Sequence, residues 1–278
     1  MAIIDKPAGV TSHDVVNQLR RHFGEKRIGH AGTLDPGATG VLVVCVGNAT
    51  RLMRFLTGVD KSYVGEIVLG ATTASLDNEG AVTATFDMSG VTVEAARAAA
   101  AEHLTGDILQ VPPMVSALKV DGKRLHELAR AGIEVERQPR PVTVSRFDLE
   151  STDDPMVLRA TVDCSSGTYI RTLADDLGRL LGGGAHLRNL RRTRVGRFTL
   201  EQAQTVESST LLAVETAVAH LPIVLVDSAG ADDVAHGRLL PVWDGDGPWA
   251  VFHDDELLAV YESFRSGQAK PVVVLVGA

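Results

Sequence analysis

The sequence is poor in the residues and runs that characterise disulfide-rich, zinc-binding and membrane proteins. It has two cysteines, Cys45 and Cys164, each inside an apolar stretch and neither in a Cys-x-x-Cys unit, which argues against a disulfide framework and a zinc site. Its longest apolar runs, residues 41–46 and 272–276, are too short to cross a bilayer. A charged N-terminal segment followed by an apolar one is absent as well. We therefore expect a soluble cytoplasmic protein with reduced, buried cysteines and no membrane partner.

Several common catalytic signatures are missing too. The sequence contains no Gly-x-x-x-x-Gly-Lys-Ser/Thr phosphate loop, no Gly-x-Gly-x-x-Gly, no His-Glu-x-x-His and no Gly-x-Ser-x-Gly. These patterns carry nucleotide, dinucleotide, metal and serine-nucleophile chemistry. Their absence weakens the interpretation of this chain as a metal-, cofactor- or nucleotide-dependent enzyme.

The charge is distributed unevenly along the chain. The net formal charge is -8, but residues 198–278 hold twelve acidic and only three basic residues, which leaves the preceding part nearly neutral. In that part a run without any acid contains Arg188, Arg191, Arg192, Arg194 and Arg197. Because the screening length at physiological salt is about 8 Å, such a local basic surface matters more to a phosphate than the charge of a remote segment. The run indicates either a solvated face or a phosphate-binding surface.

The most unusual stretch is residues 29–40. It holds four glycines and one proline around Asp35, and it runs into the apolar residues 41–46. This composition does not form a long helix or a central strand. Pro36 also biases Asp35 away from helical dihedral angles. The stretch therefore predicts a loop whose backbone shape presents one carboxylate.

Hydrophobic periodicity predicts interspersed helices and strands. Helices are expected at residues 12–23, 93–104 and 124–131, and a further helix follows Arg171 with Leu173, Ala174, Leu177, Leu180 and Leu181 as its inward stripe. Strands are expected at residues 41–46, 61–69, 142–149 and 157–164. Many strands with few clean βαβ repeats favour an α+β fold on a mixed or antiparallel sheet. From about residue 222 the pattern changes to short strands and acidic turns, so we predict one domain over residues 1–222 and a small, mainly β domain over 223–278.

The chemistry available to these residues is that of a carboxylate. An aspartate is ordinarily ionised at neutral pH, and an arginine partner keeps it so in an apolar pocket. An ionised carboxylate suits a nucleophile or a base better than an acid. An aromatic ring beside it could stack on a planar base, which is worth about 1 to 3 kcal/mol.

The loop and further motifs resemble those of the TruB-type tRNA pseudouridine synthases in order and rough spacing. Beside residues 29–42 the matching segments are Lys6-Pro7-x-Gly9-x-Thr11-Ser12, Lys61-x-Tyr63, Val111-Pro112-Pro113-Met114-x-Ser116-Ala117-Leu118-Lys119, Cys164-Ser165-x-Gly167-Thr168-Tyr169-Ile170-Arg171 and Gly184-Ala185-His186-Leu187-x-x-Leu190-Arg191-Arg192. The resemblance implies a pseudouridine synthase-like core with flanking helices and a PUA-like C-terminal domain. It also implies that uridine 55 in the T arm of tRNA is isomerised to pseudouridine by base flipping, without a cofactor or a metal.

The same resemblance assigns roles to individual residues. Asp35 is implied to be the essential aspartate, Tyr63 to stack on the flipped uracil and serve in C5 deprotonation, and Arg171 to pair with Asp35. The residues implied to contact the RNA are His30, Tyr169, Leu190, Arg188, Arg191 and Arg192. The sequence leaves three routes open for Asp35: attack on C1′, attack on C6 of the uracil, or removal of the C2′ proton to form a glycal.

The expected partner is tRNA, acted on by a monomer without an obligate protein partner. The C-terminal segment matches the family faintly, through Leu221-Pro222 and residues 235–238, and its acidity predicts an auxiliary role in RNA binding. The alternative is a tRNA-binding or RNA-folding module with secondary or no catalysis. The intact set of Asp35, Tyr63 and Arg171 favours the enzyme.

Overall fold

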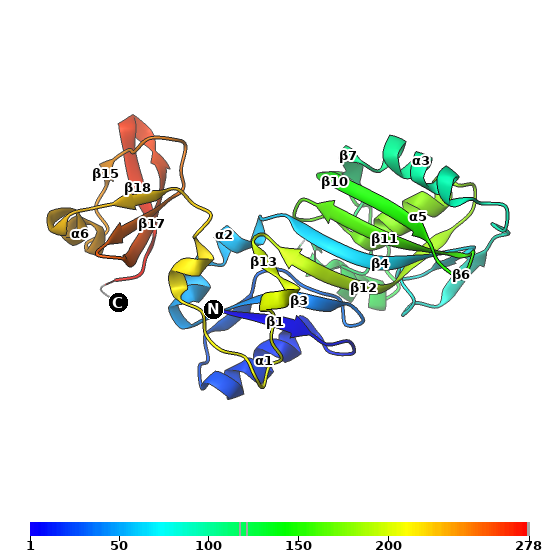
Figure 1. Ribbon diagram of the computed structural model, residues 1–278, viewed down its shortest axis with the longest axis horizontal. Coiled ribbons are helices and arrows are strands. Elements are labelled where there is room, and N and C mark those ends of the chain that lie inside the picture. Colours follow the sequence, from blue (N-terminus) through cyan, green and yellow to red (C-terminus); the bar gives the residue numbers. More distant parts are fainter. Residues whose placement is uncertain (117, 121, 277–278) are drawn as a thin grey trace.

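The main body of the protein is a mixed sheet of nine strands (Figure 1). The computed structural model describes residues 1–116, 118–120 and 122–276; Ala117, part of one family-like motif, lies outside them. The long strands follow the order β1-β3-β12-β4-β11-β10-β7, and the contact of β12 with β3 is parallel whereas its contact with β4 is antiparallel. The strands are β1 (Ala2–Lys6), β2 (Ile28–His30), β3 (Thr39–Val46), β4 (Lys61–Leu69), β7 (Gly106–Gln110), β10 (Arg140–Ser151), β11 (Val157–Cys164), β12 (Ala185–Val195) and β13 (Phe198–Thr199). The α+β fold with a mixed sheet is thus confirmed.

The structure contains a helix at each of the four places where the sequence predicts one, and two short helices, at residues 54–57 and 228–235, that we do not predict from the sequence. The helices are α1 (Ser12–Phe23), α2 (Arg54–Thr57), α3 (Val93–His103), α4 (Leu125–Arg130), α5 (Ile170–Leu180) and α6 (Ser228–Ala235). Thr11 caps α1 in a capping box with Asp14, and Gly24 ends the helix in the left-handed conformation, as capping preferences dictate. None of the helices in the described ranges is long and apolar enough to span a membrane.

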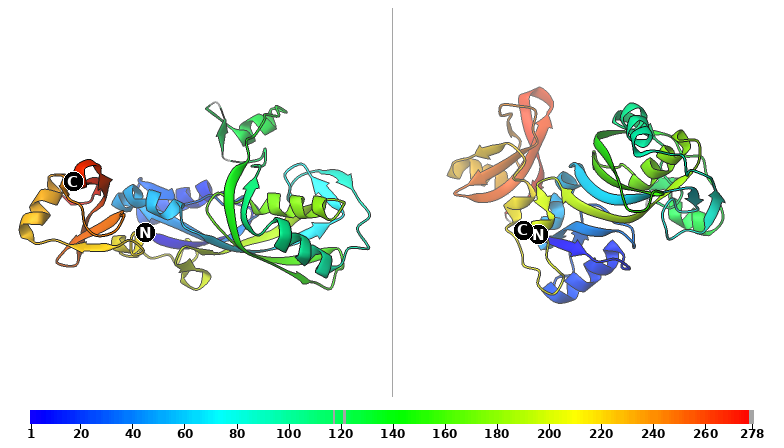
Figure 2. Two further views of the ribbon diagram at one scale, coloured as in Figure 1. Left: turned by 90° about the horizontal axis from the view of Figure 1, so that it is seen from above. Right: turned by 45° about the vertical axis from the view of Figure 1, so that its right-hand side comes forward.

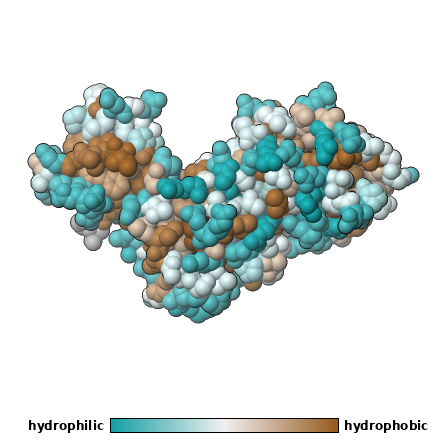
Figure 3. Space-filling model, viewed as in Figure 1, coloured by the Kyte–Doolittle hydropathy of each residue, from teal (hydrophilic) through white to brown (hydrophobic). Residues whose placement is uncertain are grey.

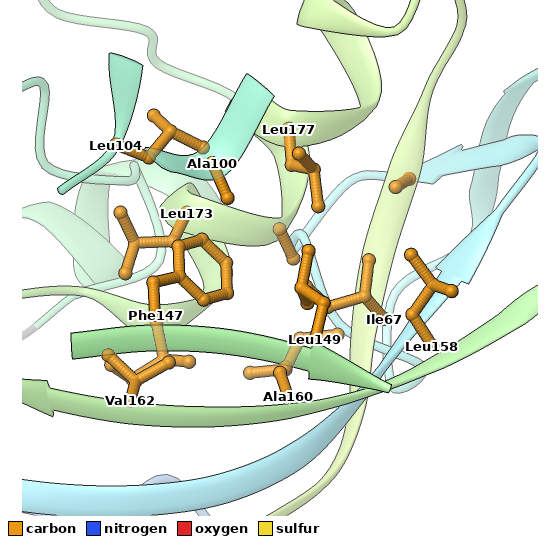
Figure 4. Packing of buried hydrophobic residues seen from close by; sticks show 14 of the residues in the cluster. Ile67, Ala100, Leu104, Phe147, Leu149, Leu158, Ala160, Val162, Leu173 and Leu177 are labelled. Carbon is orange, nitrogen blue, oxygen red and sulfur yellow. The ribbon is translucent and has the colours of Figure 1, made fainter. Parts of the chain in front are cut away.

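The largest core lies between the sheet and helices α3 and α5 (Figure 4). Phe147 and Leu149 of β10 face Leu173 and Leu177 of α5 in this layer. Leu180 was predicted to share that inward stripe, but it is 45% exposed because it stands at the very end of α5 on the solvent side. Both cysteines are buried and reduced, as expected.

Two short hairpins decorate the body. They are β5 (Ala71–Thr73) with β6 (Val82–Thr85), and β8 (Lys119–Val120) with β9 (Lys123–Arg124). The segment that carries β8, β9 and α4 stands off the body of the sheet (Figure 2). The polar loop between β5 and β6 turns instead toward β12, where Asp77 bridges to Leu187.

The C-terminal part forms a second sheet with the strand order β14-β16-β17-β18-β15. Its strands are β14 (Ile223–Leu225), β15 (Leu240–Pro241), β16 (Trp249–His253), β17 (Glu256–Phe264) and β18 (Gln268–Val274). The surface of this part has an apolar area beside hydrophilic residues (Figure 3), and Ile223 and Leu225 are among its exposed large hydrophobic residues. An Arg54–Glu262 ion pair of 2.9 Å ties it to the main body. The exact domain division at residue 222 stays a prediction.

Candidate active site

Asp35 lies in the loop between β2 and β3, and hydrogen bonds from the start of α1 fix that loop. The Ser12 hydroxyl accepts from the Leu34 amide at 2.9 Å and donates to the Leu34 carbonyl at 3.1 Å. The Gly9 amide donates to the Pro36 carbonyl at 2.9 Å. The residues on both sides of Asp35 are therefore anchored, which explains why the segment from Lys6 to Ser12 accompanies the loop.

The end of the loop requires a glycine. Gly40 has a φ of 103°, and a Cβ atom there would lie 2.1 Å from the Arg192 carbonyl oxygen. Only glycine combines this dihedral angle with so close an approach. The close approach lets β3 run beside β12 directly after the loop.

Lys6 is a buried cation beneath the loop. Its side chain is fully buried, and its ammonium donates to the carbonyls of Pro7, Val10 and Pro36 at 2.8, 2.7 and 3.1 Å. Burial lowers the pKa of Lys6 to about 8. The lysine thus ties the turn after β1 to the residue that follows Asp35.

We expect Lys6→Met to reduce the pH dependence of stability in mildly alkaline solution. The Lys6 pKa is about 8 in the folded protein and 10.5 otherwise, so the unfolded chain binds more protons between these values and the free energy of unfolding rises with pH there. Between pH 8 and pH 9 this lysine contributes a rise of about 1 kcal/mol. Urea titrations of the wild type and of Lys6→Met at pH 8 and pH 9 give the rise in the free energy of unfolding for each protein. The difference between these two rises is the contribution of Lys6. Identical rises would show that Lys6 does not titrate in this range.

Arg171 pairs with Asp35, as predicted, and is itself held by three further acceptors. Its Nε lies 3.0 Å from Asp35 Oδ2 and 3.6 Å from Asp77 Oδ2. Its two terminal nitrogens donate to the carbonyls of Ser75 and Val115 at 2.6 and 2.7 Å. The arginine side chain is 5% exposed whereas that of Asp35 is 40% exposed. A rigid, buried cation therefore orients a carboxylate that stays accessible.

Asp77, Ser75 and Val115 were not predicted from the sequence. Asp77 sits in the polar loop between β5 and β6, which has no periodicity and matches none of the motifs. It is positioned by a hydrogen bond from the Ser75 hydroxyl and by the Glu79 amide, which donates at 3.1 Å. The only local signal is an acidic residue in a turn, which is too common to be informative.

Asp35 and Arg171 line a cavity of about 260 Å³. Tyr63, Tyr169, Leu190 and Arg192 line it too, so six of the predicted site residues meet at one place. A second cavity of about 30 Å³ adjoins Asp35, Arg171, Leu190 and Arg188 on the side of Asp77. Neither cavity is lined by His30, Arg191, Arg194 or Arg197.

Tyr63 stands on the central strand β4, opposite Val162 of β11 and Arg192 of β12. Its position confirms the predicted strand face, which also carries Ile67 and Leu69. Burial raises the pKa of the Tyr63 hydroxyl. The residue is thus a neutral phenol at physiological pH.

Tyr169 is held at the start of α5 by a buried glutamine that the sequence did not reveal. The Tyr169 amide donates to Gln110 Oε1 at 2.7 Å, and Gln110 Nε2 donates to the Tyr169 carbonyl at 3.1 Å. Gln110 is 2% exposed. This two-way clamp fixes the turn that precedes Arg171.

His30 is half-buried at the end of β2. Its Nδ1 atom is buried and has no hydrogen-bond partner in the described part of the chain. Burial lowers the pKa of His30, and the nearby charge of Arg192 adds to this effect. The imidazole is therefore neutral at physiological pH.

The arginine run is paired with acids that come from other strands. The ion pairs are Arg188–Glu66 at 2.6 Å, Arg191–Asp5 at 2.7 Å and Arg194–Asp163 at 3.6 Å. Arg192 is 1% exposed and donates to the carbonyls of Val41, Thr33 and Gly32. It therefore does not stand on the phosphate-facing surface predicted for it; instead it supports the Asp35 loop from below.

The fold and the site together define a pseudouridine synthase: a mixed sheet presents one accessible carboxylate, paired to a buried arginine, beside a tyrosine in a base-sized cavity. Residues 20–170 match the model of the TruB family pseudouridylate synthase N-terminal domain, and residues 171–221 match that of the tRNA pseudouridylate synthase B C-terminal domain. The chain belongs to the TruB family and is an RNA-modifying isomerase.

Curated relatives and solved structures agree with this assignment. The chain is 46% identical to tRNA pseudouridine synthase B of Thermobifida fusca (strain YX), over 100% of this chain and 99% of that protein. It is 51% identical to the protein of the same name from Rhodococcus jostii (strain RHA1), over 86% of this chain and 82% of that one. A solved Cbf5-Nop10-Gar1 complex contains a chain of similar fold, with a TM-score of 0.73, 26% identity, and coverage of 98% of this chain and 83% of that chain.

Proposed function

We propose that this protein converts uridine 55 in the T arm of tRNA into pseudouridine. The observation that carries the proposal is the ion pair of Asp35 with the buried Arg171 on the wall of the Tyr63 cavity. The names of the relatives, tRNA pseudouridine synthase B, support tRNA as the substrate.

In the proposed mechanism the target uridine leaves the T loop and enters the cavity. Stacking on Tyr63 offsets part of the few kcal/mol needed to unstack a nucleotide, because a base–aromatic stack is worth about 1 to 3 kcal/mol. Tyr169 and Leu190 line the same space. His30, a neutral imidazole, contacts a base displaced from the T loop.

Asp35 then acts on the sugar or on the uracil, with Arg171 fixing its direction. The bond between C1′ and N1 breaks, the uracil turns, and C5 bonds to C1′. The proton on C5 leaves and N1 gains one, so the reaction is a balanced isomerisation without an outside reactant. As a neutral phenol, Tyr63 takes up the C5 proton only as it passes its own proton on.

The test is an incubation of the protein with an unmodified tRNA transcript. Release of tritium from uridine labelled at C5 counts the isomerisation events, and carbodiimide-dependent primer extension locates the product. We expect one pseudouridine per tRNA, at position 55, and none in a transcript with cytidine at that position. Binding without tritium release would favour the alternative, a tRNA-binding or RNA-folding module without catalysis.

The ion-paired arginines make a quantitative prediction for RNA binding. Arg188 is partly exposed and borders the smaller cavity, so we propose that it contacts a phosphate. Arg188→Ala should weaken tRNA binding severalfold and lower the slope of log affinity against log salt by about 1. Filter binding at several salt concentrations measures both quantities.

Arg238→Ala is the matched control for Arg188→Ala. Arg238 is also paired with a carboxylate, that of Asp233, but it stands in the acidic C-terminal part. We expect its salt slope to equal that of the wild type, in keeping with an auxiliary role for a PUA-like domain. An unchanged salt slope in Arg188→Ala would show that Arg188 contacts no phosphate and belongs to a solvated face.

The same proposal covers partners and location. It includes that the protein acts as a monomer in the cytoplasm and needs no obligate protein partner. Sedimentation of the protein alone and with tRNA tests the stoichiometry.

A further inference from the structure

Two more cations lie on the wall of the Asp35 cavity, Lys61 and Arg192. They are 6% and 1% exposed. Lys61 donates to the carbonyls of Thr57 and Val59 at 3.1 and 2.7 Å. Within the described ranges neither cation forms an ion pair with a carboxylate, in contrast to Arg171 and Arg188.

The two cations meet at one end of the cavity. A Cβ atom on Gly32 would lie 3.7 Å from both Arg192 Nη1 and Lys61 Cε. Burial and the charge of Arg192 lower the pKa of Lys61 to about 8, so each cation acts on the other. Like charges buried side by side without a carboxylate partner destabilise a fold. A role in the reaction inside the cavity would explain why the chain carries both cations there despite this cost.

The proposed reaction needs positive charge at such a place. When the C1′–N1 bond breaks, its electron pair stays on the uracil, while C1′ receives a pair from the Asp35 carboxylate or from the C2′–H bond. If Asp35 adds to C6 instead, the electron pair of the C5–C6 double bond moves to C5 and onto the oxygen of the C4 carbonyl. In all three routes the base carries a negative charge before C5 bonds to C1′.

We propose that Lys61 and Arg192 stabilise the negative charge that develops on the uracil. This inference rests on the proposed function. Fixed donors and charges aimed at developing charge in a water-poor site are an effective form of catalysis. A phosphate contact fits these two residues less well, because a phosphodiester remains charged and partly hydrated throughout, which suits exposed arginines such as Arg188. A flat base that has left the water suits cations that are almost fully buried.

The experiment compares two substrates that differ in how much stabilisation the anion needs. A T-arm RNA carries either uridine or 5-fluorouridine at the target position, and the fluorine withdraws electrons from the uracil anion. Rearrangement of the target nucleotide is followed in single turnovers at saturating enzyme, by nuclease digestion and chromatography. We expect Lys61→Met to lower the rate by about 100-fold with uridine and by about 10-fold or less with 5-fluorouridine.

Two further variants separate charge from structure. Lys61→Arg keeps the charge and should recover most of the uridine rate. Lys6→Met removes a second buried lysine, also with a pKa of about 8, that does not line the cavity. Its rate loss should be the same with both substrates, because it acts on the backbone of the loop and not on the base.

The outcomes distinguish this inference from the proposed function. Equal rate losses of Lys61→Met with both substrates would overturn the role of Lys61. A wild-type protein that rearranges neither substrate would instead overturn the proposed function. Should Lys61→Met lack a cooperative thermal transition, Lys61→Gln replaces it, since the amide still donates to a carbonyl but has no charge.

Discussion

Asp35→Asn will lower the single-turnover rate of pseudouridine formation by at least about 10³-fold, while the affinity for tRNA stays within about threefold of the wild type. The amide has the shape of the carboxylate but is neither a nucleophile nor a base. The binding surface is preserved, because Arg171 keeps Asp77 and the carbonyls of Ser75 and Val115 as acceptors. Tritium release and filter binding measure the two quantities.

Asp148→Asn is the matched control for this variant. Asp148 is also a partly exposed aspartate paired with an arginine, Arg146, at 2.5 Å. It stands on β10 and does not line the cavity. We expect its rate and affinity to match the wild type. If Asp35→Asn turned over tRNA as fast as the wild type, Asp35 would not be the reacting group of the cavity.

Arg171→Lys will lower the single-turnover rate by about 10²-fold even though the charge is retained. Arg171 serves Asp35, Asp77, Ser75 and Val115 with three separate nitrogens. A single ammonium on a flexible stem cannot span those acceptors, so Asp35 loses its fixed direction and two carbonyls lose donors. Single-turnover kinetics measures the loss, and thermal unfolding should show a lower midpoint by a few degrees.

Arg146→Lys provides the matched control, since within the described part of the chain Arg146 forms an ion pair with the exposed Asp148 alone. An exposed pair of this kind contributes at most about 1 kcal/mol. We expect no change in rate and almost none in the unfolding midpoint. A rate for Arg171→Lys within threefold of the wild type would mean that the charge of Arg171, and not its geometry, is what Asp35 requires.

These expectations assign different roles to the charged groups around one cavity. Asp35 reacts, Arg171 directs it, and Lys61 and Arg192 balance charge on the base, while Lys6 holds the loop. The net charge of -8 does not oppose RNA binding, because the catalytic part concentrates its buried cations at the site and the excess of acidic over basic residues lies in the C-terminal part.

Local patterns in the sequence were sufficient for several elements, but not for the central strand β12, where we expected only a run of arginines. The capping box of α1, the two-residue period of β4 and the glycine-rich loop around Asp35 are each set by neighbouring residues. The motif resemblance identified Tyr63 and Arg171 as further site residues beside Asp35. Leu180 shows the weakness of the approach, since periodicity alone does not locate the last turn of a helix.

By itself, then, the sequence determined the family, the mixed sheet and the loop that presents Asp35. Only the tertiary structure decided which groups surround Asp35: Asp77 beside Arg171, the acids opposite the arginine run, and the burial of Arg192 and Lys61. The reason is that hydrogen bonds and ion pairs join strands far apart in the chain. Arg171 and the Ser75 carbonyl, for example, are 96 residues apart, and no local period or composition encodes which side chains the sheet register brings together.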